Sequence, residues 1–163
     1  MKRIKMNGSI GKGKYAIVDD VQYKKLNKFT WYLNEYGYAC RMTNINGKRT
    51  SFRMHREIMN AKKNDLVDHI NRNTLDNRIS NLRFCTKSQN AINTAKTLSK
   101  CGYKGVSLDI RSNLTKRYRA RVKYNGITYF IGRFATAIEA AMAYNAKVKE
   151  LFGEFAYLNV IPD

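Results

Sequence analysis

The residues best suited to chemistry in this chain lie between positions 66 and 93. Asp68 and His69 are adjacent, and His69, Asn81 and Asn90 are separated by twelve and nine residues. Hydrolysis of a phosphodiester requires a deprotonated water, a positive charge on the scissile phosphate and a stabilised leaving oxygen. His69 is suited to be the general base, because histidine exchanges protons near neutral pH. The segment is therefore a candidate site for phosphodiester hydrolysis.

The other members of this set predict one metal ion. Asp68 and Asn90 offer two oxygen ligands, and a site completed by water and phosphate suits Mg²⁺ or Mn²⁺ better than zinc. We expect Asn81 to accept a hydrogen bond from the second nitrogen of His69 and so fix its tautomer. Turn formation is the alternative reading of the asparagines, but it explains neither the Asp68-His69 pair nor Asn90. Three arginines are candidate phosphate contacts or simply solvated surface residues: Arg72, Arg78 and Arg83.

The local sequence predicts the elements that position these residues. Residues 66–70 form a strand, a polar loop follows, and residues 83–85 return as a second strand. Thr86 to Gln89 has the form of a capping box and opens a helix that carries Asn90. Upstream, residues 15–19 read as a strand, and Asp19 or Asp20 can cap a helical segment extending to Trp31.

A β-hairpin and a short helix are expected before the site. Residues 31–42 and 48–54 are aromatic and β-branched runs around an Asn-Gly turn. Arg41 and Arg53 lie on this hairpin, whose basic face is either solvated or a ribbon in contact with DNA. The following helix, over 55–60, begins at His55, which can be catalytic in principle but is more often structural in such a position.

The motifs VDHIN, DNRISNLR and TKSQN resemble the HNH nuclease family. With the upstream segments YAIVDD, WYLNEYGYACRM and MHREIM, the resemblance covers most of residues 10–97. It implies a ββα-metal fold of the branch found in phage and intron-encoded homing endonucleases, with signature positions at His69, Asn81 and Asn90. The last position is often His in the family, whereas this chain has Asn90.

A second unit begins after the small polar segment 94–100. Residues 103–110, 117–124 and 127–134 read as three strands, the last two joined at Asn125-Gly126, and a helix follows from Thr136 to about Leu151. On the middle strand, Arg119, Arg121 and Lys123 alternate with apolar residues. One face of the sheet is therefore cationic, and the other is left for the helix to cover.

This second unit resembles the ethylene-response-factor (Apetala-type) DNA-binding domain, through YKGV, YRARVKYNGITYFIGRF, AIEAAMAYN and FGEFAYLN. Ser107 and Phe130 stand where the plant proteins usually have Arg and Trp, so their target sequence is not carried over. The resemblance implies a sheet face that reads a DNA groove through Lys104, Arg119, Arg121, Lys123, Thr128 and Phe130.

The composition agrees with a nucleic-acid partner. The net charge is +19, and residues 102–163 hold ten basic and five acidic side chains, so both parts of the chain are basic. No apolar run approaches the length of a membrane span, and the basic start lacks the pattern of a secretory signal. The three widely spaced cysteines indicate reduced intracellular thiols and argue against structural zinc. The resemblance to phage and intron-encoded nucleases implies the cytoplasm of a bacterial or phage-infected cell, near the nucleoid.

These observations predict an α+β protein with two domains. Residues 1–97 form the nuclease domain, with a β-rich lead-in over 1–60 and the ββα-metal motif over 61–97. Residues 98–163 form a three-stranded antiparallel sheet packed on one helix. The predicted function is site-directed cleavage of double-stranded DNA with one divalent cation and no small-molecule cofactor. A non-catalytic DNA-binding regulator is the alternative, RNA binding a more distant one, and the sequence leaves monomer or dimer open.

Overall fold

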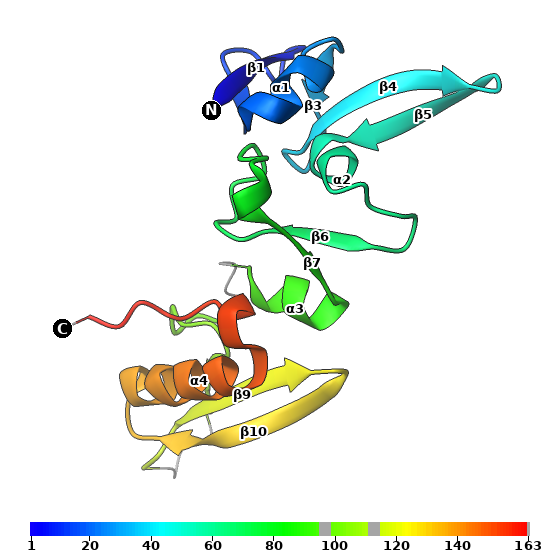
Figure 1. The fold of residues 1–163 in the computed structure, drawn as a ribbon. Coiled ribbons are helices and arrows are strands. Elements are labelled where there is room, and N and C mark those ends of the chain that lie inside the picture. Colours follow the sequence, from blue (N-terminus) through cyan, green and yellow to red (C-terminus); the bar gives the residue numbers. More distant parts are fainter. Residues whose placement is uncertain (95–98, 111–114, 163) are drawn as a thin grey trace. The chain divides into compact units, whose positions relative to one another are not determined.

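The computed structural model describes residues 1–94, 99–110 and 115–162 and has the predicted α+β class. Its contacts divide the chain into two compact units, Met1–Cys85 and Thr86–Asp163. Figure 1 gives the order of their helices and strands. No helix in the described ranges is long and apolar enough to cross a membrane.

The first unit is built on a five-stranded sheet in the order β2-β1-β3-β4-β5. The predicted hairpin is present, with the turn residues Asn46 and Gly47 at positive φ. Strand β1 was not predicted, although Ile4 and Met6 alternate with charged residues along it and are buried. The strands are β1 (Lys2–Asn7), β2 (Tyr15–Val18), β3 (Trp31–Leu33), β4 (Ala39–Ile45) and β5 (Lys48–Arg53).

The core of this unit lies around Trp31, Met6 and Met54, all with no exposed surface. Helix α1 (Asp20–Leu26) ends before Trp31, so the prediction of a helical segment reaching that residue was wrong. Trp31 starts β3 instead, and its indole Nε1 donates to the carbonyl of Leu26 at 2.8 Å. This bond satisfies a buried indole that would otherwise lose its water partner.

The predicted site hairpin consists of β6 (Leu66–His69) and β7 (Leu82–Cys85), which pair antiparallel. The short helix α2 (Met54–Ile58) precedes it, and the 3₁₀ turn η1 (Ile79–Asn81) leads into β7. Ile17 on the edge strand β2 bonds the loop between the two strands: its N–H donates to Leu75 O at 2.7 Å and its carbonyl accepts from Asn77 N at 2.8 Å. The sheet therefore carries the loop that holds the site.

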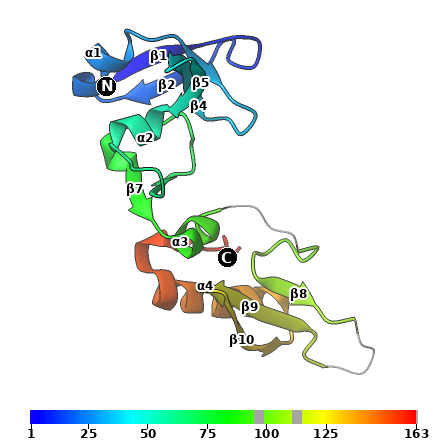
Figure 2. The ribbon, with the colours of Figure 1, turned by 90° about the vertical axis from the view of Figure 1, so that its right-hand side faces the viewer.

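The second unit has the predicted three-stranded antiparallel sheet, in the order β10-β9-β8, with one long helix packed on it. Figure 2 shows α4 lying along β9. The first strand is shorter than the predicted range of 103–110. The elements are α3 (Lys87–Ile92), β8 (Val106–Leu108), β9 (Tyr118–Tyr124), β10 (Ile127–Phe134), α4 (Ala137–Phe152) and η2 (Gly153–Phe155).

Both capping signals operate in this unit. Thr86 and Gln89 exchange both hydrogen bonds of a capping box at α3, and Thr136 accepts from the amide of Glu139 at α4. Ile92 of α3 belongs to the core of this second unit, together with Tyr144 of α4. The predicted domain boundary after residue 97 remains a prediction, and residues 95–98 of the expected linker lie outside the described residues.

Candidate active site

Asp68 lies opposite Arg83 on the β6–β7 hairpin, and the two side chains form an ion pair. Both Nε and Nη2 of Arg83 lie 3.0 Å from Oδ2 of Asp68, and both side chains are nearly buried. A carboxylate and a guanidinium at such a depth must pair, because an isolated buried charge is costly. Arg83, predicted as a possible phosphate contact, thus holds the carboxylate that was predicted to bind metal.

His69 is buried at the end of β6, with its ring nitrogen Nε2 3.3 Å from Oδ1 of Asn77. An amide oxygen can only accept a hydrogen bond, so Nε2 carries the proton and Nδ1 has the lone pair that can take one. Burial lowers the pKa of His69, and the hydrogen bond to Asn77 and the carboxylates of Asp68 and Asp76 oppose that effect. The imidazole is therefore neutral near pH 7, as a general base must be.

Asn77 is the residue that orients His69, and the prediction that Asn81 makes this bond was wrong. Asn77 has no exposed surface, and its Nδ2 donates to the carbonyl of Thr74 at 3.4 Å, which turns Oδ1 toward His69. Its backbone is fixed in turn by the bond to Ile17. The local sequence does not single out Asn77, because turn formation accounts for it as well as for the neighbouring asparagines.

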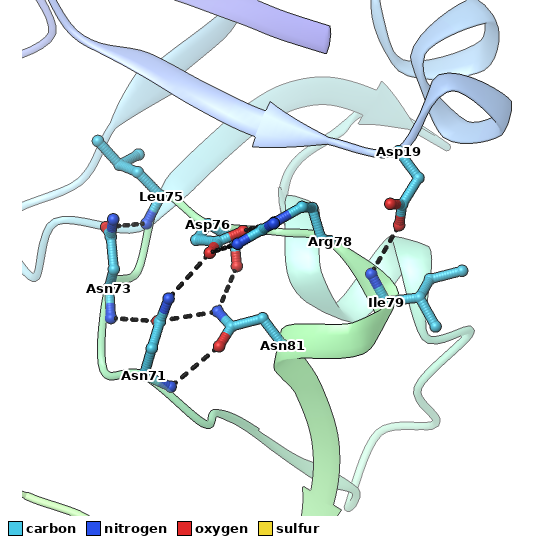
Figure 3. A network of polar contacts seen from close by, with 8 residues as sticks. All are labelled: Asp19, Asn71, Asn73, Leu75, Asp76, Arg78, Ile79 and Asn81. Carbon is cyan, nitrogen blue, oxygen red and sulfur yellow. Dashed lines mark hydrogen bonds and ion pairs between the residues drawn. The ribbon is translucent and has the colours of Figure 1, made fainter. Parts of the chain in front are cut away.

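Asn81 instead closes the loop that surrounds the site (Figure 3). Its Oδ1 accepts from Asn71 N at 2.9 Å, and its Nδ2 donates to Asn71 Oδ1 at 2.9 Å and to Asp76 O at 2.7 Å. These bonds join the two ends of the loop, next to the backbone bond from Ile70 N to Asn81 O at 2.9 Å. Asn81 therefore shapes the site through the backbone rather than through the imidazole.

The same network engages Arg78, which was predicted as a DNA contact. Its Nε and Nη2 donate to the two oxygens of Asp76 at 2.7 and 2.6 Å, and Asn71 Nδ2 also donates to Asp76 at 2.8 Å. Hydrogen bonding from Arg78 lowers the pKa of Asp76 most. Arg78 thus has a structural partner inside the loop, and its role with DNA stays a prediction.

Two further bonds hold the loop to the rest of the first unit. Thr74 Oγ1 donates to Gly37 O at 2.7 Å, and Ile79 N donates to the carboxylate of Asp19 at 2.8 Å. Asp19 precedes α1 but makes no side-chain capping bond, contrary to one of the two capping options predicted for that helix. Its carboxylate serves the loop instead (Figure 3).

Two aromatic rings lie beside the imidazole of His69. The ring of His55, at the start of α2, is 5.0 Å from it between centroids and nearly perpendicular, and Tyr38 is 5.9 Å away. His55 is buried, and burial, followed by the neighbouring charges of His69 and arginines, lowers its pKa to about 3. Sequence reasoning left the role of His55 open, because its proximity to His69 depends on the packing of α2.

The metal site predicted from sequence combines Asp68 of the first unit with Asn90 of the second, and it stays a prediction. Asp68 supplies a carboxylate and Asn90 an amide oxygen, a donor set that fits a hard cation such as Mg²⁺ or Mn²⁺. In the described ranges, no three His, Cys, Asp or Glu side chains form a cluster that could hold a metal. Asn90 is exposed on α3, in the second unit, and its role as ligand stays a prediction.

The sheet of the second unit has the predicted cationic face. Lys123 pairs with Thr128 and Arg121 with Phe130, while Ala120 and Val122 of the same strand point into the core. Arg121, Lys123, Thr128 and Phe130 are all exposed. Arg119 is held at one end of this face, 3.7 Å from the buried carboxylate of Asp109, which also pairs with Arg133 at 2.7 Å.

Two residues predicted to contact DNA have other partners. Lys104 Nζ donates to the carbonyls of Ile92 and Thr94 at 2.6 and 2.8 Å, where it satisfies the carboxyl end of α3. Arg41 forms a two-point ion pair with Glu57, with Nε–Oε2 at 3.0 Å, and both side chains are only 14% exposed. The roles of Lys104 and Arg41 in DNA binding stay predictions.

Arg53, the other arginine of the hairpin that was predicted to contact DNA, is exposed. Its guanidinium lies over the ring of Tyr38, 5.5 Å from the centroid. The ring of Tyr38 also contacts those of His55 and His69, so it touches both the guanidinium of Arg53 and the candidate base. The role of Arg53 in DNA binding stays a prediction.

A buried histidine beside a paired aspartate on a β-hairpin agrees with the HNH nuclease class that the sequence motifs resemble. The family profile described as HNH endonuclease matches residues 62–92, which contain this hairpin. An uncharacterized HNH endonuclease, L560 of Acanthamoeba polyphaga mimivirus, is 34% identical over 157 residues, covering 93% of this chain and 78% of the relative. The chain belongs to the HNH endonuclease family, whose members are phosphodiesterases that act on DNA. No solved structure matches it.

Proposed function

We propose that the protein is a site-directed homing endonuclease of a phage or mobile element, which hydrolyses one phosphodiester of double-stranded DNA per active site. The observation that carries the proposal is the bond between His69 Nε2 and Asn77 Oδ1. It leaves Nδ1 of a neutral imidazole as the proton acceptor, as activation of a water for in-line attack requires. One active site per chain gives a nick, and two chains acting together give a double-strand break.

Asp68 and Asn90 would hold one divalent cation, Mg²⁺ or Mn²⁺. When bound, the cation supplies positive charge to the scissile phosphate and to the leaving oxygen. Asp68 enters this role already oriented, because Arg83 holds one of its oxygens, Oδ2. Arg53 is proposed to contact a phosphate near His69. Asn81 supports catalysis indirectly, by closing the loop from which Asn77 reaches the imidazole.

The second unit is proposed to find the DNA site, in the manner of the ethylene-response-factor domain that its sequence resembles. Its support is the exposed row of Arg121, Lys123, Thr128 and Phe130, on the sheet face away from the apolar core. Arginine and lysine reach base edges and phosphates, and an aromatic ring contacts thymine methyl groups. The net charge of +19 favours the same polyanion. Such a protein is expected to act at the DNA of a bacterial or phage-infected cell.

The test is cleavage of supercoiled plasmid DNA with Mg²⁺ or Mn²⁺, using a library that contains random target sites. We expect metal-dependent nicked or linear product from the wild-type protein and none above background from His69→Ala. Chelation should abolish the product. Binding of the library without any cleavage, in every metal tried, would refute the enzyme and leave a DNA-binding regulator. Preference for structured RNA over duplex DNA at equal salt would refute the proposed partner.

A further inference from the structure

His55 is an unusual residue for the position it occupies. Its side chain is 4% exposed, and Nδ1 has no hydrogen-bond partner within the described part of the chain. Buried polar atoms in folded proteins almost always have a partner, so one without it requires an explanation. An apolar side chain would fill the same space without this cost. The same ring also lies against the imidazole of His69.

The ring of His55 lies beside those of Tyr38 and His69, with its centroid 5.0 Å from each of theirs. It meets His69 at an interplanar angle of 71°, edge against face, which is a favoured geometry for aromatic pairs. Its neighbour Met54 is fully buried in the core of the first unit. The start of α2 is therefore fixed, and so is the ring that it presents to His69.

We propose that His55 is a positioning residue for His69: its neutral ring forms the wall that keeps the imidazole of His69 turned toward Asn77. The contact between Nε2 and Oδ1 is 3.3 Å, a long hydrogen bond that holds the ring weakly by itself. A second surface against the ring removes the orientations in which this bond is lost. The wall must be flat, and it must carry no charge, since a cation there would repel the proton that His69 takes up.

This inference rests on the proposed role of His69 as base, and a pair of variants tests it. His55→Ala removes the wall, and His55→Phe keeps an uncharged ring. Ile58→Ala is the control, because it removes apolar volume at the last residue of the same helix, where Ile58 packs against the core, and leaves Met54 and the ring of His55 in place. Cleavage rates are measured per folded molecule, with the folded fraction taken from thermal melts.

We expect His55→Ala to lower kcat by about 10- to 100-fold with KM little changed, as for other residues that orient a catalytic ligand. His55→Phe should recover most of this loss, and Ile58→Ala should leave kcat per folded molecule near the wild-type value. Long-range ¹H–¹⁵N spectra of His69 give a second reading. We expect the signature of a protonated, hydrogen-bonded Nε2 in the wild-type protein and in His55→Phe, and exchange between tautomers in His55→Ala.

The two readings separate this inference from the proposed function. A wild-type protein that cuts no DNA refutes the function, whereas the spectra of His69 can still be compared among the variants. Unchanged His69 spectra and unchanged kcat in folded His55→Ala would refute the positioning role. Equal losses in His55→Ala and His55→Phe, with unchanged His69 spectra in both, would also refute it, because the ring would then not act through its neighbour.

Discussion

Asn77→Ala tests the central geometric assignment, that Asn77 and not Asn81 orients the base. The variant removes the contact of 3.3 Å to His69 Nε2 and the bond from Nδ2 to Thr74 O. A neutral hydrogen bond contributes about 1 kcal/mol net, and 1.4 kcal/mol corresponds to a tenfold change in rate. Since this bond is long, we expect a loss near the lower end of the range for orienting residues, about tenfold in kcat.

The assay is single-turnover nicking of a target plasmid under saturating protein, so that binding does not limit the rate. Asn73→Ala is the control, because Asn73 lies in the same loop and its side-chain Oδ1 accepts a hydrogen bond from the backbone N–H of Leu75. Its bond to Asn71 uses the backbone N–H of Asn73, which the variant keeps. Asn81→Ala should lower stability through the loss of its loop bonds, and its rate per folded molecule should fall less than that of Asn77→Ala. The reverse order of the two rates would refute the assignment.

Three further predictions follow from burial and charge. His55 binds a proton below about pH 6.5 when unfolded but only near pH 3 when folded, so the free energy of unfolding should fall by about 2 kcal/mol from pH 8 to pH 5. Urea melts should show this loss in the wild-type protein, and His55→Phe should lack that part of it. Gly105→Ala should destabilise the second unit by more than about 3 kcal/mol in thermal melts. The reason is that φ of Gly105 is +76° and an added Cβ would lie 2.1 Å from the ring of Tyr144. A melting point unchanged from wild type would contradict this packing. Arg121→Ala should reduce the slope of log affinity against log salt by about 1 if it meets a phosphate, whereas Lys147→Ala, on α4, should not change it.

The parts predicted well from sequence are those with local causes. The hairpin at Asn46-Gly47 follows from residues that accept positive φ, and the start of α3 follows from the spacing of Thr86 and Gln89. The alternation along β9 gave the cationic face, because strand geometry requires successive side chains to point to opposite sides. Strand β1 was not predicted, because only two buried positions, Ile4 and Met6, alternate with polar residues along it, and so short an alternation is a weak signal.

The partners of individual polar side chains were not predictable in this way. Arg41, Arg83 and Lys104 all carry the positive charge expected of a DNA contact, yet each is engaged by a group brought near only by the fold. Asn77 and Asn81 are chemically identical and four residues apart. What distinguishes them is the attachment of Asn77 to Ile17, sixty residues earlier in the chain.

This dependence on distant residues bears on what constitutes the nuclease unit. The family motif spans residues 62–92, but the loop within it is bonded to Ile17, Asp19 and Gly37, and the base is packed against His55. Every one of these groups lies upstream of the motif. An isolated hairpin would expose the loop to water, where its backbone amides would bond solvent and Asn77 would lose its fixed direction. The N-terminal sheet is therefore part of the structure that orients His69, and the proposed nuclease site includes residues outside the family motif.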